Sequence, residues 1–212
     1  MNTSTQQFLM DSGAQTPIIC GSMYPGSNPE LIAAVSEHGG FGVVQPVTLT
    51  SLYGHDFRAG LQLIKTLTDK PFGVNFTLFG GANQKYHEQM QEWMQVSIEE
   101  GVKFFLTSLG KPDAVLKVAK EHGIAVYHDV PNKKVALAMR DCGVDGINCI
   151  NWRGGGQTGV QSAEQFMEEL HDIDIPMICA GGMGNANDVK QVLDMGYAGV
   201  QMGTRFLATK EC

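Results

Sequence analysis

The sequence predicts a single (β/α)8 barrel, and three observations support that fold class. Short apolar runs alternate with amphipathic segments along the whole chain, as in parallel βαβ units. Eight such runs occur, and most are continuously apolar, as expected for strands covered on both faces. Glycine-rich segments follow the last two runs, where a barrel of this class forms a phosphate site from the loops after strands seven and eight.

Each predicted strand is a short run that ends at a turn or loop signal. The eight are Pro17–Cys20, Gly42–Gln45, Phe72–Phe76, Lys103–Thr107, Ile124–Tyr127, Gly146–Ile150, Met177–Ala180 and Gly199–Met202. The first intervening helix has Asn28 as its N-cap and Pro29 at its first position, and it ends at Gly39. No GxGxxG motif follows the first run, which argues against a dinucleotide-binding sheet.

Composition narrows the class of protein further. With 212 residues, 43% of them hydrophobic, the chain is expected to form one domain over residues 1–212. The net charge of −7 and the scattered Lys and Arg argue against a nucleic-acid or anionic-membrane partner. No run approaches the roughly 20 apolar residues of a membrane span. The five cysteines include no CxxC pair, so we expect free thiols, no metal site and a cytoplasmic protein.

The two late glycine segments are the strongest functional signal. Ala180–Gly184 follows one apolar run, and Gln201–Phe206 follows the next. Glycine allows the backbone to approach a bound group closely, and the start of a helix presents unpaired N–H groups to an anion. The two segments therefore predict a site for a phosphate-bearing cofactor.

The end of the chain departs from a complete barrel. It stops at Cys212, where an eighth helix is expected to begin. A barrel that lacks this helix would expose apolar surface on its last and first strands, and such a surface favours association. We therefore expect a domain that is incomplete at its C-terminus, either truncated or covered by a partner, with a homo-oligomer as one form.

Several short motifs occur in barrel order between Thr16 and Glu211. They are Thr16–Ile19, Pro29–Leu31 with Gly39–Gly42, Pro71–Asn75, Gly143–Gly146, Gly154–Gly156, Ala180–Gly182 and Gln201–Phe206. In this order and spacing they resemble the nitronate monooxygenase family, also called 2-nitropropane dioxygenases, which includes flavin-dependent enoyl-acyl-carrier-protein reductases. The resemblance covers almost the whole chain.

The resemblance implies non-covalently bound FMN, a small-molecule substrate and O2. Carried over by motif, the residues that flank the isoalloxazine ring are Ser22, Met23 and Asn75. Those that hold the ribityl phosphate are Gly155, Gly156, Gly181, Gly182, Gln201, Met202, Gly203 and Thr204.

One position departs from the family pattern. The family's catalytic histidine follows the glycine pair after strand six, and Gln157 occupies that place here. An imidazole accepts a proton near neutral pH and an amide does not, although the Gln157 amide is still able to donate a hydrogen bond to a nitro or carbonyl oxygen. Because nitronates are already anions, we expect nitronate oxidation to persist and turnover of neutral nitroalkanes to be largely lost. His128, expected just past strand five, is the candidate replacement base, and Arg153 offers a positive charge.

Other functions remain open at this point. One is an NAD(P)H-dependent enoyl reductase of the same superfamily. Another is a catalytically silent flavin-binding protein, which Gln157 and the missing last helix favour. Other phosphate-binding barrels, such as inosine-monophosphate dehydrogenase, need a nucleophilic cysteine in a loop after strand six. The cysteine nearest to that place, Cys149, lies inside a predicted strand, which argues against this class of enzyme.

Overall fold

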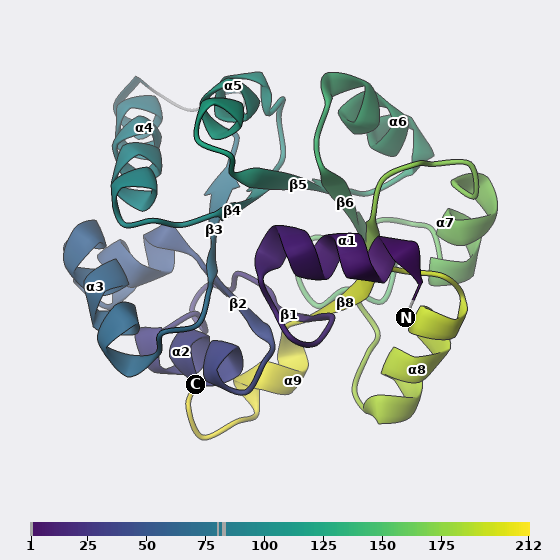
Figure 1. Ribbon diagram of the computed structural model, residues 1–212, viewed down its shortest axis with the longest axis horizontal. Coiled ribbons are helices and arrows are strands. Elements are labelled where there is room, and N and C mark those ends of the chain that lie inside the picture. The colour runs from purple at the N-terminus through teal and green to yellow at the C-terminus, as the bar shows by residue number, and fades with distance from the viewer. Residues whose placement is uncertain (1, 80, 82–83) are drawn as a thin grey trace.

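The strands form a closed, all-parallel barrel in the order in which they occur along the chain (Figure 1). The computed structural model describes residues 2–79, 81 and 84–212. β8 closes the sheet onto β1, with Ile19 opposite Gln201. The strands are β1 (Ile18–Cys20), β2 (Phe41–Val44), β3 (Gly73–Thr77), β4 (Phe104–Ser108), β5 (Ala125–Val130), β6 (Gly146–Ile150), β7 (Met177–Ala180) and β8 (Gly199–Met202). The (β/α)8 prediction is confirmed, and the largest boundary error is at β5, which continues three residues beyond Tyr127.

Helices cover the outside of the barrel (Figure 1). They are α2 (Pro29–Glu37), the π-helix η1 (Thr48–Leu52), α3 (Phe57–Leu67), α4 (Gln84–Glu99), α5 (Asp113–Glu121), α6 (Lys133–Cys142), α7 (Ala163–Glu169) and α8 (Ala186–Asp194). The first turns of α2, α3, α6, α7 and α8 are held by the side chain of the N-cap residue; Asn28, for example, accepts a hydrogen bond from the backbone of Leu31 at 2.7 Å. After β8 the chain forms only the four-residue helix α9 (Thr204–Leu207). None of the described helices is both long enough and apolar enough to cross a bilayer.

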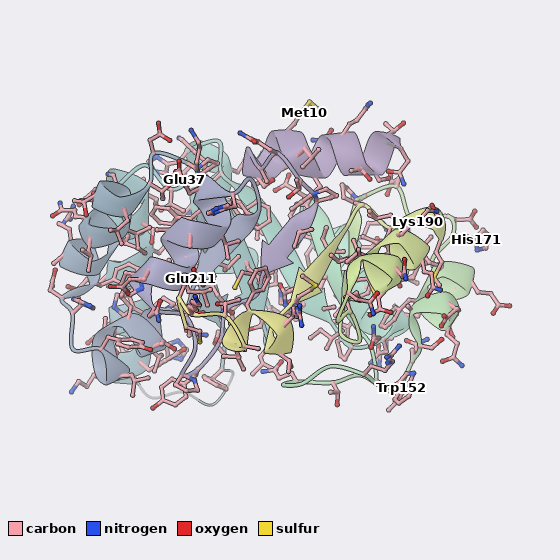
Figure 2. All side chains as sticks on the ribbon, turned by 90° about the horizontal axis from the view of Figure 1, so that it is seen from below. Met10, Glu37, Trp152, His171, Lys190 and Glu211 are labelled. Carbon is pink, nitrogen blue, oxygen red and sulfur yellow. The ribbon has the colours of Figure 1, made fainter. Side chains whose placement is uncertain are left out.

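The N-terminal helix α1 (Thr3–Ser12) was not predicted. It lies across one end of the barrel, while Trp152, in the loop after β6, lies at the opposite end (Figure 2). Phe8 of this helix is fully buried and packs edge-on against Phe104 and Tyr127, with ring centroids 6.3 and 5.9 Å apart. α1 thus covers the end of the barrel where the strands begin and leaves the other end open.

Candidate functional site

A cavity of about 350 Å³ opens where the strands end, a volume within the range of about 300–1,000 Å³ typical of small-molecule sites. Every strand, or the loop directly after it, contributes to its lining. This is the end of a (β/α)8 barrel at which catalytic residues gather. The position of the cavity therefore makes it the candidate active site.

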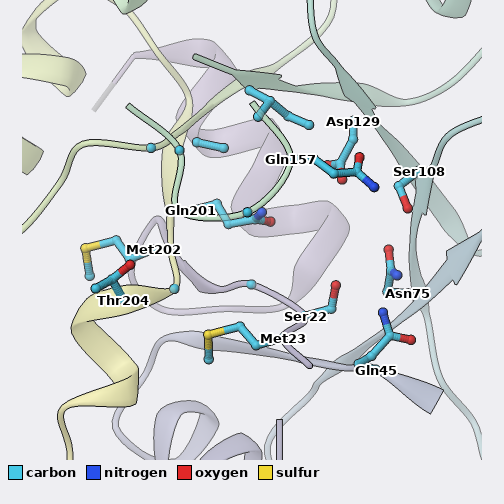
Figure 3. Close-up of a pocket in the computed structure, with 18 of the residues that line it drawn as sticks. Ser22, Met23, Gln45, Asn75, Ser108, Asp129, Gln157, Gln201, Met202 and Thr204 are labelled. Atoms are coloured by element: carbon cyan, nitrogen blue, oxygen red, sulfur yellow. The ribbon is translucent and has the colours of Figure 1, made fainter. Parts of the chain in front are cut away.

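The residues implied by the family resemblance converge on this one cavity. Gln157 lines it, and so do all the predicted cofactor-binding residues: Ser22, Met23, Asn75, Gly155, Gly156, Gly181, Gly182, Gln201, Met202, Gly203 and Thr204. Figure 3 shows Met202 and Thr204 on one side of the cavity and Asn75 on the other. Their separation in the sequence is large, so the closed barrel is what brings them together.

One wall is built from backbone because side chains do not fit there. Gly181 and Gly182, directly after β7, adopt positive φ angles of 110° and 88°, a region that L-residues with side chains rarely adopt. A Cβ on Gly181 would lie 2.7 Å from the backbone nitrogen of Gly154, in the loop after β6. Asn151 links the two loops: its amide donates to the Gly181 carbonyl at 2.8 Å, and its oxygen accepts from the Arg153 N–H at 2.8 Å. The result is a glycine cradle that would fit a phosphate-bearing group.

The expected contribution of the helix after Gly184 was wrong. The start of α8 is closed by its own capping box, in which Asn185 accepts from the backbone of Asn187 and Asp188. The Asp188 carboxylate in turn accepts from the N–H groups of Gly184 and Asn185, at 2.8 and 3.1 Å. These N–H groups are therefore engaged within the helix end, and the backbone that lines the cavity belongs to the preceding glycines.

The opposite wall is built from polar side chains of neighbouring strands. Gln45, Asn75, Ser108 and Asp129 follow one another there, from β2 to β5 (Figure 3). The side-chain oxygens of Asn75 and Gln201 are buried and have no hydrogen-bond partner among the described residues. A buried polar atom without a partner costs free energy, so these two acceptors indicate that a ligand with hydrogen-bond donors completes the site.

Asp129 is the titratable group that sequence reasoning did not assign to the site. It lies in β5 and lines the cavity, and its Oδ1 accepts a hydrogen bond from the Asn148 side chain at 2.6 Å. Burial raises the pKa of this carboxyl from its ordinary value of 3.8 to about 7, against the opposing effect of the Asn148 hydrogen bond. At neutral pH both protonation states are therefore populated.

The placement of His128 at the rim of the barrel was wrong. His128 lies inside β5 and is 2% exposed, and it is absent from the cavity lining. Its Nδ1 lies 2.8 Å from the Thr107 hydroxyl, which donates to the Tyr127 carbonyl. Burial lowers the pKa of His128 to about 4, so its imidazole is neutral and acts as a hydrogen-bonded part of the packing. Strand alternation, which places successive side chains on opposite faces, turns Asp129 toward the cavity instead.

The closed barrel has a glycine-lined cavity of ligand size at its strand ends, the place where catalysis occurs in this fold. The family model described as nitronate monooxygenase matches residues 6–212. The chain belongs to the nitronate monooxygenase family, which confirms the resemblance found in the sequence.

Individual relatives differ in the reactions for which they are named. The (3aS,4S,5R,7aS)-5-hydroxy-7a-methyl-1-oxo-octahydro-1H-indene-4-carboxyl-CoA dehydrogenase of Rhodococcus jostii is 30% identical over 200 residues, which cover 94% of this chain and 54% of that protein. The nitronate monooxygenase of Pseudomonas aeruginosa is 24% identical, with 98% and 70% coverage. The structure of FabK from Thermotoga maritima superposes with a TM-score of 0.82 at 28% identity, covering 97% of this chain and 63% of that one. The chain spans about half the length of the Rhodococcus relative.

Proposed function

We propose that the protein is an FMN-dependent oxidoreductase whose substrate reacts in the cavity at the strand ends. The observation that carries this proposal is the convergence of all the predicted cofactor-binding residues on one cavity. Membership of the nitronate monooxygenase family and the oxidoreductase names of its relatives support it. The chemical fit supports it as well, because the cavity combines the glycine cradle with buried side-chain oxygens of Asn75 and Gln201 that have no partner among the described residues.

The two kinds of cavity wall, one of glycine backbone and one of polar side chains, suggest how the cofactor would be held. The glycines after β6 and β7, together with Gly203 and Thr204, would bind the phosphate. Ser22, Met23 and Asn75 would contact the ring, with the Asn75 oxygen available to accept from a ring N–H. Bound FMN supplies a two-electron acceptor that can be reoxidised by O2; the protein supplies binding, orientation and electrostatics.

For the substrate we propose an alkyl nitronate oxidised with O2. Arg153, the one cation among the described lining residues, suits an anionic substrate, and the Gln157 amide is available as a donor to a nitro oxygen. The second candidate is an NAD(P)H-dependent enoyl reductase, favoured by the 28% identity to FabK along 97% of the chain. A catalytically silent flavin protein is the third.

A single set of anaerobic measurements tests these candidates. The purified protein is examined for flavin absorbance, and the released cofactor is identified by mass. The holoprotein is then mixed separately with propane-2-nitronate and with NADH or NADPH, and loss of flavin absorbance is followed. Rapid reduction by the nitronate is expected. Flavin that is reduced by the nicotinamide but not by the nitronate would favour the enoyl reductase. Bound flavin that neither compound reduces would favour the catalytically silent protein. A folded protein that binds no flavin would overturn the proposal.

Replacing Gly182 with alanine is expected to weaken FMN binding at least tenfold. A Cβ at this position would lie 3.0 Å from the Arg153 side chain, and the φ angle of 88° strains any residue with a side chain. The dissociation constant is measured by flavin fluorescence during titration of the apoprotein. The matched control is Gly184→Ala in the same loop, where the added Cβ makes only ordinary contact at 3.7 Å with Asp188. Equal binding by both variants would contradict the assignment of the cradle.

A further inference from the structure

We propose that Asp129 is the base that removes a proton from the substrate carbon next to a nitro group, the task for which Gln157 is chemically unsuited. The inference rests on the proposed function for its substrate class. It names a residue in strand β5, whereas the family resemblance marks a position in the loop after β6. It also changes the expectation that neutral nitroalkanes are poor substrates of this protein.

The geometry of β5 supports this assignment. Tyr127 points into the barrel, where it packs with Phe8 and Phe104. Side chains two residues apart in a strand lie on the same face, so Asp129 follows Tyr127 on the inner face, one layer nearer the open end. There it lines the cavity and stands across from the side that carries Met202 and Thr204 (Figure 3). A carboxyl at this place faces the space between the two walls.

The surroundings of Asp129 leave it as the cavity's acid–base group. Among the described lining residues it is the only carboxyl, and Arg153 and Tyr24 are the only other ionisable groups. The neighbouring strands turn neutral side chains toward it, Ser108 from β4 and Asn148 from β6. Its own strand directs His128 to the opposite face. Within this described lining, no second carboxylate competes with Asp129 for a proton.

Asn148 holds the carboxyl in position. Its amide donates to Oδ1 at 2.6 Å, and no other hydrogen bond to this carboxyl occurs among the described residues. The second oxygen is therefore available to a ligand in the cavity. With a pKa of about 7, the group is balanced between acid and base near neutral pH, which is the condition that favours general catalysis.

The proposed step is a proton transfer and needs no oxidant. The C–H bond of a neutral nitroalkane breaks, the proton forms an O–H bond with the Asp129 carboxylate, and the electron pair moves into the nitro group. The products are the nitronate anion and the neutral Asp129 carboxyl, which then returns its proton to water. Gln157 is available to donate a hydrogen bond to the nitro oxygen on which charge develops, a stabilisation that acts mainly in the transition state.

Hydrogen–deuterium exchange isolates this step from oxidation. The holoprotein is incubated anaerobically with nitroethane in D2O, and loss of the signal from the protons next to the nitro group is followed by proton NMR. The wild-type protein is expected to accelerate exchange above the buffer rate, with a rate that rises as pH increases through about 7 and then levels. Asp129→Asn, which keeps the shape and the Asn148 contact, is expected to lower the protein-catalysed rate at least about 100-fold.

The matched control is Asp145→Asn. Burial also raises the pKa of Asp145, but its side chain accepts from the backbone of Val126 and is outside the cavity lining. Exchange by this variant is expected to equal that of the wild type. Exchange unchanged in Asp129→Asn, or lost equally in both variants, would overturn the proposal.

A binding measurement provides a readout that does not depend on turnover. Isobutyrate has the shape and charge of propane-2-nitronate, and its affinity is measured by calorimetry. For the wild type, binding is expected to weaken as pH rises through about 7, because the ionised carboxylate repels the anion. Asp129→Asn should lose that dependence, and a dependence retained in the variant would contradict the assignment. Exchange and binding that depend on Asp129 without reduction of flavin by nitronate would refute the proposed oxidation while leaving the base in place.

Discussion

Replacing Phe8 with alanine is expected to lower the free energy of unfolding by about 3–5 kcal/mol, the usual cost of removing a fully buried phenyl ring. The ring is 0% exposed and contacts two further aromatic rings inside the barrel. Because α1 is a single helix that covers the end of the barrel, little neighbouring structure is available to fill the vacated volume. Urea unfolding followed by circular dichroism measures the loss.

The control for this prediction is in the same helix. Met10 is 70% exposed, so Met10→Ala is expected to change the free energy of unfolding by no more than about 0.5 kcal/mol. If Phe8→Ala were as mild as Met10→Ala, α1 would not be docked on the barrel in solution. A loss of stability confined to Phe8→Ala would make α1 part of the folded core.

The barrel and its glycine wall were predictable because each depends on local sequence. Apolar runs identify strands that are covered on both faces, and the last three strands have the predicted bounds. Gly181 and Gly182 form part of a motif because the backbone there requires their positive φ angles. α1 was missed because its residues 3–12 are mostly polar. Its attachment depends on burial of Phe8 and on a hydrogen bond that the Tyr127 hydroxyl donates to the Asp11 carboxylate.

The polar wall was not predictable for a different reason. Ser108 and Asp129 belong to no motif, and their function depends on the face to which each strand turns them. The predicted strand ended at Tyr127, so His128 was placed at the rim, whereas β5 continues to Val130. With the correct end of the strand, alternation from the buried Tyr127 assigns Asp129 to the cavity and His128 to the outer face. An error of three residues at the end of the strand thus led to His128, and not Asp129, being assigned to the site.

Asp129→Asn is expected to stabilise the apoprotein above about pH 7, by on the order of 2 kcal/mol. The pKa rises from 3.8 to about 7 on folding, which at about 1.4 kcal/mol per unit corresponds to roughly 4 kcal/mol. Access of water to the cavity reduces this value by about half. A carboxylate that destabilises the folded protein when it is ionised would be retained for its function and not for stability.

The direction of the pH dependence follows from proton binding. Between about pH 4 and 7 the folded protein holds a proton on Asp129 that the unfolded chain has released, so this group's contribution to stability falls as pH rises. His128, whose pKa is lowered from 6.5 to about 4 on folding, acts in the opposite direction, because its stabilising effect is lost as pH falls through that range. The two contributions largely offset each other in the wild type.

The Asp129→Asn variant should therefore make the effect of His128 on the pH dependence of stability visible. With Asp129→Asn, the free energy of unfolding is expected to rise from about pH 4 to 6.5 more steeply than in the wild type, and the difference between the two proteins should be greatest above about pH 7. Urea titrations at a series of pH values measure both curves. Parallel curves would mean that Asp129 has its ordinary pKa in the folded protein and is ionised throughout this pH range. Diverging curves would establish the buried, titrating carboxyl that proton transfer in this cavity requires.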